Sequence, residues 1–218
     1  MPVATRKHRS NPSWIHRHVT DPYVRLSKEK GYRARSAFKL IELDDAEHFL
    51  KPGARVVDLG SAPGSWSQVV RERLTDRSGK MKGGIVAIDI LPMQPIEGVT
   101  FICGDFRETE ALEKLEEALG GGTVDVVLSD MAPNLSGIAA VDEARSAHLN
   151  ELALAFCDEH LARDGTFVIK VFQSSGFSQF VRALKDRFVK VATRKPPASR
   201  DSSAEVYLVA RGRRPRAA

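Results

Sequence analysis

The sequence predicts an α/β fold: a Rossmann-like, mostly parallel seven-stranded sheet with helices on both faces and an antiparallel last strand. First, short β-branched apolar segments alternate with longer segments of helical periodicity, which is the pattern of a doubly wound sheet. Second, one such segment, Val56 to Leu59, runs directly into a glycine turn and a helix. Third, the last two apolar segments are joined only by a short polar connector, which favours an antiparallel pair.

The elements alternate regularly along the chain. Helical segments have apolar residues at three- and four-residue spacing, whereas strands are short apolar runs. Pro52-Gly53 stops the first helix and the glycines at 120–122 stop the third, and we expect a mobile loop at 134–142. In chain order, the expected elements are a helix at 33–50, a strand at 55–59, a helix at 65–74, strands at 85–88 and 99–102, a helix at 108–119, a strand at 124–128, a helix at 142–161, a strand at 165–169, a helix at 177–184, and strands at 188–193 and 206–210.

The turn after the first strand is the part of the chain with the clearest functional signal. Gly60 and Gly64 allow positive φ and close approach of the backbone, and Pro63 cannot continue a strand. Ser65 is the expected N-cap of the next helix, which leaves backbone N–H groups at the carboxyl end of the strand. In open α/β sheets, ligands bind at that edge.

The residues near this turn favour a particular kind of ligand. The spacing Gly60-x-x-x-Gly64 differs from the dinucleotide fingerprint G-x-G-x-x-G, which disfavours a pyrophosphate. The Asp58 carboxylate suits a cationic or hydroxyl-bearing ligand such as S-adenosylmethionine. Asp89, at the end of the second strand, can accept hydrogen bonds from a ribose diol, and Asp105 can reach an adenine edge. A strand–turn–helix without a ligand, and an ordinary aspartate in a turn, are the alternatives.

Length and composition indicate one domain. The chain has 218 residues, of which 42 % are hydrophobic and 28 % charged, which is ordinary for a globular protein. It has neither an 18-residue apolar run nor an apolar h-region at its N-terminus, so we expect no membrane span and no secretory signal. Cys103 and Cys157 lie in apolar contexts and are expected to be reduced, buried thiols. These features favour the cytoplasm.

Positive charge is concentrated at the two ends of the chain. Residues 1–35 carry nine lysines and arginines against two acidic residues, and residues 211–218 carry four arginines. Such segments bind polyanions, and interleaved aromatic residues such as Trp14 favour RNA or single strands. We therefore expect a mobile, basic RNA-binding arm at 1–30, one domain at 31–210 and a basic tail at 211–218. The N-terminal histidines lack accompanying ligands, so no metal site is expected.

Four charged residues suggest a catalytic site. Lys39 lies on the helix before the first strand, whereas Asp130, Lys170 and Glu205 lie at strand ends. Lys170 follows an apolar run, so its amine must pair with a carboxylate, have a lowered pKa or extend to water. Each residue alone could be an ordinary surface charge, but three at strand ends beside the expected ligand edge and one on the helix leading into the first strand jointly indicate a site.

Several motifs together resemble the FtsJ/RrmJ family, and the resemblance extends over residues 30–210. Ser61 and Ser65 stand where other small residues are common in that family. The matching motifs are residues 58–68, 89–93, 104–106, 129–134 and 170–173.

The resemblance implies an S-adenosylmethionine-dependent methyltransferase fold and methylation of a ribose 2′-hydroxyl in RNA. It implies a uridine of 23S rRNA, in the A-loop of the large ribosomal subunit, as the target. Separately from the resemblance, we expect a monomer. The implied catalytic tetrad is Lys39, Asp130, Lys170 and Glu205, with Lys170 as general base. The implied cofactor contacts are Gly64, Trp66, Asp89, Asp105 and Asp130, and the turn itself adds Asp58 and Gly60 as expected contacts.

Other functions stay open on the sequence alone. A tRNA or mRNA-cap 2′-O-methyltransferase would share the fold, although no extra domain for cap recognition is evident. A non-catalytic RNA-binding protein of ribosome assembly would not need the four charged residues. A nucleotide-dependent oxidoreductase is disfavoured because G-x-G-x-x-G is missing.

Overall fold

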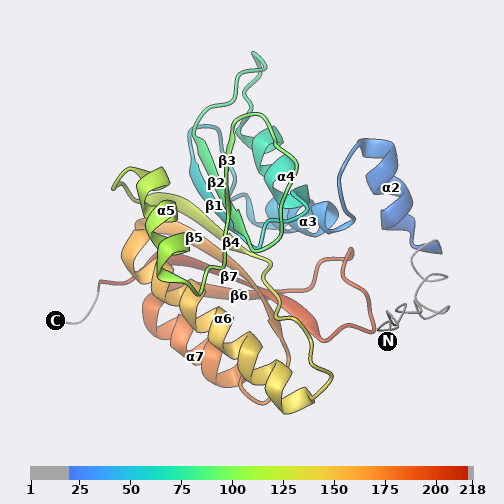
Figure 1. Cartoon of the computed structure of the whole chain (residues 1–218), viewed down its shortest axis with the longest axis vertical. Helices are drawn as coiled ribbons and strands as arrows, with labels where there is room; N and C mark the ends of the chain where they lie inside the picture. The colour runs from blue at the N-terminus through green and yellow to red at the C-terminus, as the bar shows by residue number, and fades with distance from the viewer. Residues whose placement is uncertain (1–19, 216–218) are drawn as a thin grey trace, which may run out of the picture.

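A computed structural model of the chain describes residues 20–215 and is built around one sheet. The strands are β1 (Arg55–Leu59), β2 (Gly84–Asp89), β3 (Val99–Cys103), β4 (Val124–Ser129), β5 (Leu161–Phe172), β6 (Phe188–Arg194) and β7 (Glu205–Arg213). They lie in the order β3-β2-β1-β4-β5-β7-β6, and β7 runs antiparallel to both of its neighbours. The predicted seven-stranded, mostly parallel sheet is confirmed (Figure 1).

Helices cover both faces of this sheet (Figure 1). They are α2 (Pro22–Lys30), α3 (Ser36–Glu47), α4 (Ser65–Leu74), α5 (Thr109–Leu119), α6 (Ala139–His160) and α7 (Phe177–Arg187). Residues of α3 and α4 share one hydrophobic cluster, whereas residues of α5, α6 and α7 share the other. Within residues 20–215, no helix is both long enough and apolar enough to cross a membrane.

The strands divide their side chains between the two clusters. In β1, Val56 packs with the α3 and α4 side and Val57 with the opposite side, as the two-residue period of a strand requires. In β5, Phe167 and Val168 divide in the same way. Each fully buried side chain of this size contributes about 1.5–3 kcal/mol to folding, so these central strands fix the sheet firmly.

Strand register brings the functional segments to one edge. Leu59 is paired with Ile88 of β2 and with Ser129 of β4, so the parallel strands β1, β2 and β4 end at the same level. The Gly60 amide donates to Ile88 O over 2.9 Å, and the Asp130 amide donates to Leu59 O over 3.1 Å. The glycine turn and the segment after β4 are therefore adjacent.

The N-terminal region differs from the expected mobile arm at 1–30. Residues 22–30 form α2, and its N-cap Asp21 accepts a hydrogen bond from the Tyr23 amide. The centroid of the Tyr23 ring lies 5.5 Å from that of the Phe38 ring. The sequence missed this helix because it is short and mostly polar. The rest of the expected arm, including Trp14 and the nearby histidines, lies outside the described residues.

The C-terminal tail also differs from the expectation. β7 continues to Arg213, because residues 211–213 pair with β6. The Arg211 guanidinium forms an ion pair with Glu47 over 3.1 Å, and Arg213 Nη1 donates to Asp158 O over 2.7 Å. Arg214 Nε donates to Phe188 O over 3.1 Å. These three cations hold the fold together and are not a free basic tail.

Two smaller expectations are corrected. Helix α6 begins at Ala139, within the expected loop at 134–142, and the carboxylate of Asp142 accepts hydrogen bonds from Ser136 and Gly137. Cys157 is buried as predicted, but Cys103 is exposed because β3 is an edge strand.

Candidate active site at the carboxyl ends of the strands

The glycine turn between β1 and α4 has the predicted backbone. Gly60 has φ 79° and Gly64 has φ 105°, in the left-handed region that other residues rarely adopt. A Cβ at Gly60 would lie 2.8 Å from Met131 Cγ, so the turn packs closely against the segment after β4. The helix begins differently from the prediction: Gly64 is the N-cap, and Ser65 is the first helical residue, with its hydroxyl 2.7 Å from that of Ser36.

Two of the expected cofactor contacts lie beneath the turn. Asp58 is fully buried, and its Oδ2 accepts a hydrogen bond from Ser67 Oγ over 2.7 Å. Burial raises the pKa of Asp58 to about 7. Trp66 is 2 % exposed, and its Nε1 donates to Ser36 O over 2.9 Å. A ligand at the turn cannot touch the Asp58 side chain as it stands, so this carboxyl supports the turn from below.

Asp89 at the end of β2 connects two loops. Its Oδ2 accepts a hydrogen bond from the Ala62 amide and its Oδ1 accepts one from the Leu91 amide, each over 2.8 Å. A carboxylate offers about four lone-pair directions, so two remain for the hydroxyls of a ligand. The side chain is partly exposed, as a binding residue at this edge requires.

Asp105, after β3, is paired with a neighbouring arginine. Arg107 Nη2 lies 2.5 Å from Asp105 Oδ2, and the Arg107 amide donates to Oδ1 over 3.0 Å. The hydrogen bonds from Arg107 lower the pKa of Asp105, so this carboxyl is an acceptor at neutral pH. The sequence did not single out Arg107.

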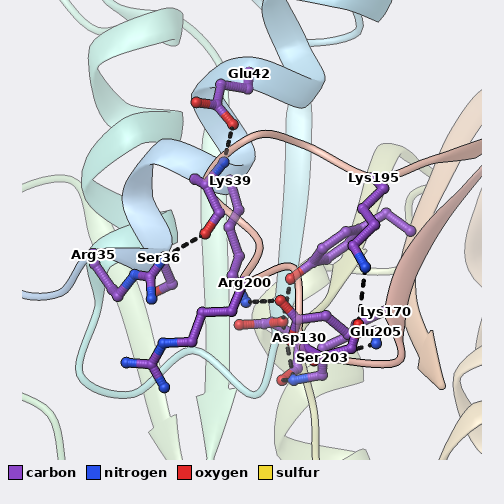
Figure 2. Close-up of polar contacts among 12 residues, drawn as sticks. Arg35, Ser36, Lys39, Glu42, Asp130, Lys170, Lys195, Arg200, Ser203 and Glu205 are labelled. Atoms are coloured by element: carbon purple, nitrogen blue, oxygen red, sulfur yellow. Dashed lines mark hydrogen bonds and ion pairs between the residues drawn. The ribbon is translucent and has the colours of Figure 1, made fainter. Parts of the chain in front are cut away.

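The structure brings the four predicted catalytic residues together as two ion pairs (Figure 2). Lys39 Nζ, from α3, lies 2.5 Å from Glu205 Oε1 at the start of β7. Lys170 Nζ, from β5, lies 3.0 Å from Asp130 Oδ1 and donates to Asp130 O over 2.7 Å. All four side chains are less than one-fifth exposed.

Sheet register explains this convergence. β4 pairs Ser129 with Ile169 of β5, so Asp130, directly after β4, lies beside Lys170. Lys170 lies within β5, which continues to Phe172 and does not end at residue 169 as predicted. β5 pairs Phe172 with Glu205 and Lys170 with Tyr207. Glu205 therefore reaches the site because the antiparallel strand β7 begins where β5 ends.

Tyr207 is a site residue that the sequence reasoning missed. Its hydroxyl donates to Asp130 Oδ1 over 3.0 Å, and its ring centroid lies 5.8 Å from Lys39 Nζ. The ring is fully buried and lies 5.8 Å from that of Trp66. Burial, with the charge of Asp130, raises the pKa of Tyr207, so its hydroxyl stays a donor. Its position two residues after Glu205, on the same face of a strand, was the available signal.

The charges within the site are balanced. Burial alone would raise the pKa of Glu205, but the hydrogen bond and charge of Lys39 outweigh it and hold that pKa below its ordinary value. Two amines thus face two carboxylates in a largely buried setting. Such an arrangement can orient a hydroxyl group, and an amine of the site can accept the proton of that hydroxyl only in its neutral form.

Comparisons with known proteins agree with this geometry. A family model described as FtsJ-like methyltransferase matches residues 32–213. The chain is 56 % identical over 205 residues to Ribosomal RNA large subunit methyltransferase E of Bordetella pertussis, covering 94 % of this chain and 98 % of that protein. It is 53 % identical over 213 residues to the protein of the same name from Ralstonia nicotianae, covering 94 % and 96 %.

The chain belongs to the FtsJ-like methyltransferase family. The resemblance found in the sequence motifs is therefore confirmed. Among solved structures, this FtsJ-like methyltransferase is similar to a Plasmodium falciparum protein described as a ribosomal RNA methyltransferase, with 34 % identity and a TM-score of 0.72 over 84 % of this chain and 98 % of that one. Aeropyrum pernix fibrillarin, which holds natively bound S-adenosylmethionine, shares the fold at 18 % identity and a TM-score of 0.55, over 82 % and 75 % of the two chains.

The cofactor of this FtsJ-like methyltransferase is S-adenosyl-L-methionine. The strand edge suits that molecule. Helix α4 starts without a side-chain cap, so its first N–H groups can face a carboxylate. Asp89 at the end of β2 and Asp105 just after the neighbouring strand β3 present partly exposed carboxylates, which hydroxyl and amine donors can reach.

Proposed function

We propose that this protein transfers a methyl group from S-adenosylmethionine to the ribose 2′-hydroxyl of a uridine in 23S rRNA, in the A-loop of the large ribosomal subunit. The printed names of its relatives support large-subunit rRNA as the substrate. The observation that carries the chemistry is the placement of Lys170 Nζ against Asp130, at the sheet edge beside the glycine turn. In this proposal the protein acts as a monomer in the cytoplasm.

Lys170 is the general base of the proposed reaction. A ribose hydroxyl is a weak nucleophile until its proton is removed or shared, and an amine can accept that proton when it is neutral. Asp130 holds Nζ through both its carbonyl and its carboxylate, which fixes the direction of the amine. When bound, S-adenosylmethionine supplies a methyl group already activated by its sulfonium, so the protein's main task is alignment.

The second ion pair orients the first. Glu205 lies near Lys170, and the charge of Lys170 contributes to lowering the pKa of the Glu205 carboxyl. Lys39 forms an ion pair with the same carboxyl. Lys39 and Glu205 therefore bound the space in which the target hydroxyl would lie. This role distinguishes an enzyme from an RNA-binding protein that merely kept the fold.

The proposed cofactor contacts follow the strand ends. The first turn of α4, beginning at Gly64 and Trp66, would hold the amino-acid part through backbone N–H groups. Asp89 would accept from the ribose diol and Asp105 from the adenine amine, while Gly60 and Asp130 would lie beside the reacting end.

Transfer of labelled methyl tests this proposal. Large subunits lacking the modification, their naked 23S rRNA and bulk tRNA are incubated with the protein and labelled S-adenosylmethionine. Lys170→Ala is compared with the control Lys51→Ala. Lys51 is an exposed lysine before the amino end of β1, whereas the candidate site lies at the carboxyl ends of the strands. We expect label on a uridine 2′-oxygen of the large subunit, lost only in Lys170→Ala.

Other outcomes would contradict specific parts of the proposal. Label on tRNA alone would exclude the rRNA target while leaving the chemistry in place. Full activity of Lys170→Ala would exclude the assignment of the base. Normal binding of S-adenosylhomocysteine with no label on any RNA would favour a non-catalytic RNA-binding protein.

A further inference from the structure

Arg33 connects two turns that are far apart in the sequence. It lies between α2 and α3, and the sequence grouped it with the basic residues expected to meet a polyanion. In the structure its Nη1 donates to Pro63 O over 3.0 Å and to Gln94 O over 2.6 Å. Its Nη2 donates to Pro95 O over 2.9 Å. The guanidinium is therefore engaged by three backbone carbonyls.

The backbone of Arg33 is anchored as well. Its amide donates to Gln68 Oε1 over 2.9 Å, and Gln68 Nε2 donates to Gly31 O over 3.0 Å. Gln68 belongs to the first turns of α4. The residue is thus held at its backbone by α4 and at its side chain by the two turns.

The two turns are those assigned to the cofactor. Pro63 lies in the glycine turn before α4, whereas Gln94 and Pro95 lie in the loop that follows Asp89. A Cβ at Gly64 would lie 2.7 Å from Arg33 Nη1, so the guanidinium fits directly against the helix cap. The same two turns are joined by Asp89, which accepts hydrogen bonds from an amide of each.

We propose that Arg33 is a positioning residue for S-adenosylmethionine, which sets the affinity for the cofactor by holding the glycine turn and the 90–96 loop in register. The inference rests on the proposed placement of the cofactor at these turns. Turns that are already ordered lose less conformational freedom when a ligand binds, so binding is tighter.

Arginine is required by the geometry of the three acceptors. A guanidinium presents five N–H donors in a rigid planar fork, whereas a lysine amine has one nitrogen at the end of a flexible stem. Lysine at position 33 would keep the charge but would lack the fork that places one nitrogen on Pro63 O and the other on Pro95 O. Charge-conserving substitution therefore separates positioning from an electrostatic contact with RNA.

The experiment compares full-length Arg33→Lys and Arg33→Gln with Arg77→Lys, which changes an exposed arginine between α4 and β2. S-adenosylhomocysteine affinity is measured by calorimetry, and KM for S-adenosylmethionine and kcat are measured in the methyl-transfer assay. Loss of two or three hydrogen bonds predicts about tenfold weaker binding and a similar rise in KM for both Arg33 variants. We expect kcat at saturating cofactor to stay within about twofold, and Arg77→Lys to match the unmodified protein.

Further arms keep the inference falsifiable. If the Arg33 variants fold poorly, Gln68→Met removes the backbone anchor alone and should raise KM for the cofactor by about threefold. Wild-type affinity in Arg33→Lys would overturn the inference, as would a fall in kcat with unchanged KM. A loss of RNA affinity with a smaller salt dependence would show a phosphate contact instead. If the unmodified protein itself failed to bind S-adenosylhomocysteine, the assigned cofactor site would be wrong, which is a separate result.

Discussion

The Tyr207 hydroxyl donates a hydrogen bond to Asp130 Oδ1, the same oxygen that lies 3.0 Å from Lys170 Nζ. One carboxylate oxygen therefore has two donors, one neutral and one cationic. Because Tyr207 is fully buried, this bond cannot be replaced by water without rearrangement. Tyr207 thus holds the Asp130 carboxylate in place, and that carboxylate in turn holds the Lys170 amine.

Tyr207→Phe is expected to reduce kcat by about tenfold while leaving S-adenosylhomocysteine affinity within about twofold. The change removes only a hydroxyl, and the lost hydrogen bond contributes about 1 kcal/mol, which corresponds to somewhat less than tenfold before any misalignment of Lys170. Methyl transfer at saturating cofactor, combined with calorimetry, measures both quantities. An unchanged kcat would show that Asp130 needs no help from the tyrosine.

Lys39 and Glu205 are expected to show a large coupling energy in a double-mutant cycle of unfolding free energies. Both side chains are about one-seventh exposed, so removing one leaves the other largely buried without its partner. Lys39→Met and Glu205→Gln should each destabilise the protein by about 1–3 kcal/mol, and the double variant by less than their sum. Urea unfolding of the four proteins measures the coupling.

A solvent-exposed pair supplies the comparison for that cycle. Lys114 and Glu110 on α5 lie 2.6 Å apart, but both are more than half exposed. The same double-mutant cycle on this pair should give almost no coupling, because water and salt screen it. Equal coupling energies in the two cycles would contradict the idea that burial makes the Lys39–Glu205 pair important.

Asp58 is expected to make the protein less stable as pH rises. Its pKa is about 7 in the folded protein, against about 3.9 in an unfolded chain, so between these values the folded state binds a proton that the unfolded state does not. Stability from this group is full below about pH 4 and is lost as pH rises through 7. From pH 5 to pH 8 the loss is about 2–3 kcal/mol.

Asp58→Asn should remove that pH dependence, since an amide does not titrate and its oxygen can still accept from Ser67. Unfolding free energies at pH 5 and pH 8, measured without cofactor, test this. Asp164→Asn, which changes an exposed aspartate, should leave the wild-type difference intact. If the unfolding free energy of Asp58→Asn still fell between pH 5 and pH 8 as in the wild-type protein, another group would be responsible for the pH dependence.

Removal of residues 1–19 is expected to weaken RNA binding more than cofactor binding. This segment contains four of the N-terminal cations, and each phosphate contact contributes about 0.7–0.9 to the slope of log affinity against log salt. The slope should therefore fall by up to about three units. An unchanged slope would contradict an RNA-binding role for the segment.

The position of that truncation matters. Removal of residues 1–30 also deletes α2, which would uncover Phe38 and release Arg35 from Asp21, an ion pair of 2.5 Å. The longer deletion should therefore lower the melting temperature more than the shorter one. Thermal unfolding of both variants separates loss of an RNA contact from loss of structure.

The sequence predicted the sheet well because its strands are short apolar runs between clear breakers. The charged residues at their ends, such as Asp130 and Lys170, were predicted for the same reason, since parallel strands end at one edge. Lys39 lies on helix α3 and Glu205 begins the antiparallel strand β7, so the rule for parallel strands does not place them. Their distance of 2.5 Å depends on tertiary packing that periodicity does not contain.

The errors have physical causes. Ser65 is a favourable N-cap by residue type, but the positive φ of Gly64 puts the cap one residue earlier. The arginines of the expected tail were counted as free charge, yet Arg211 pairs with Glu47, which is remote in sequence. Arg33, counted among the basic residues of 1–35, likewise has partners within the fold, namely three backbone carbonyls. A charge count cannot show which cations already have partners within the fold.

The position of β7 has a consequence for synthesis of the chain. Among the strands of residues 20–215 it is the last to be synthesised, yet it lies between β5 and β6 in the sheet. Until it emerges, β6 has no partner strand and β5 has an open edge, so the nascent sheet exposes pairing groups. A chain ending before residue 205 would lack both Glu205 and Tyr207. The segment after residue 204 thus closes the sheet and adds Glu205 and Tyr207 to the proposed catalytic site.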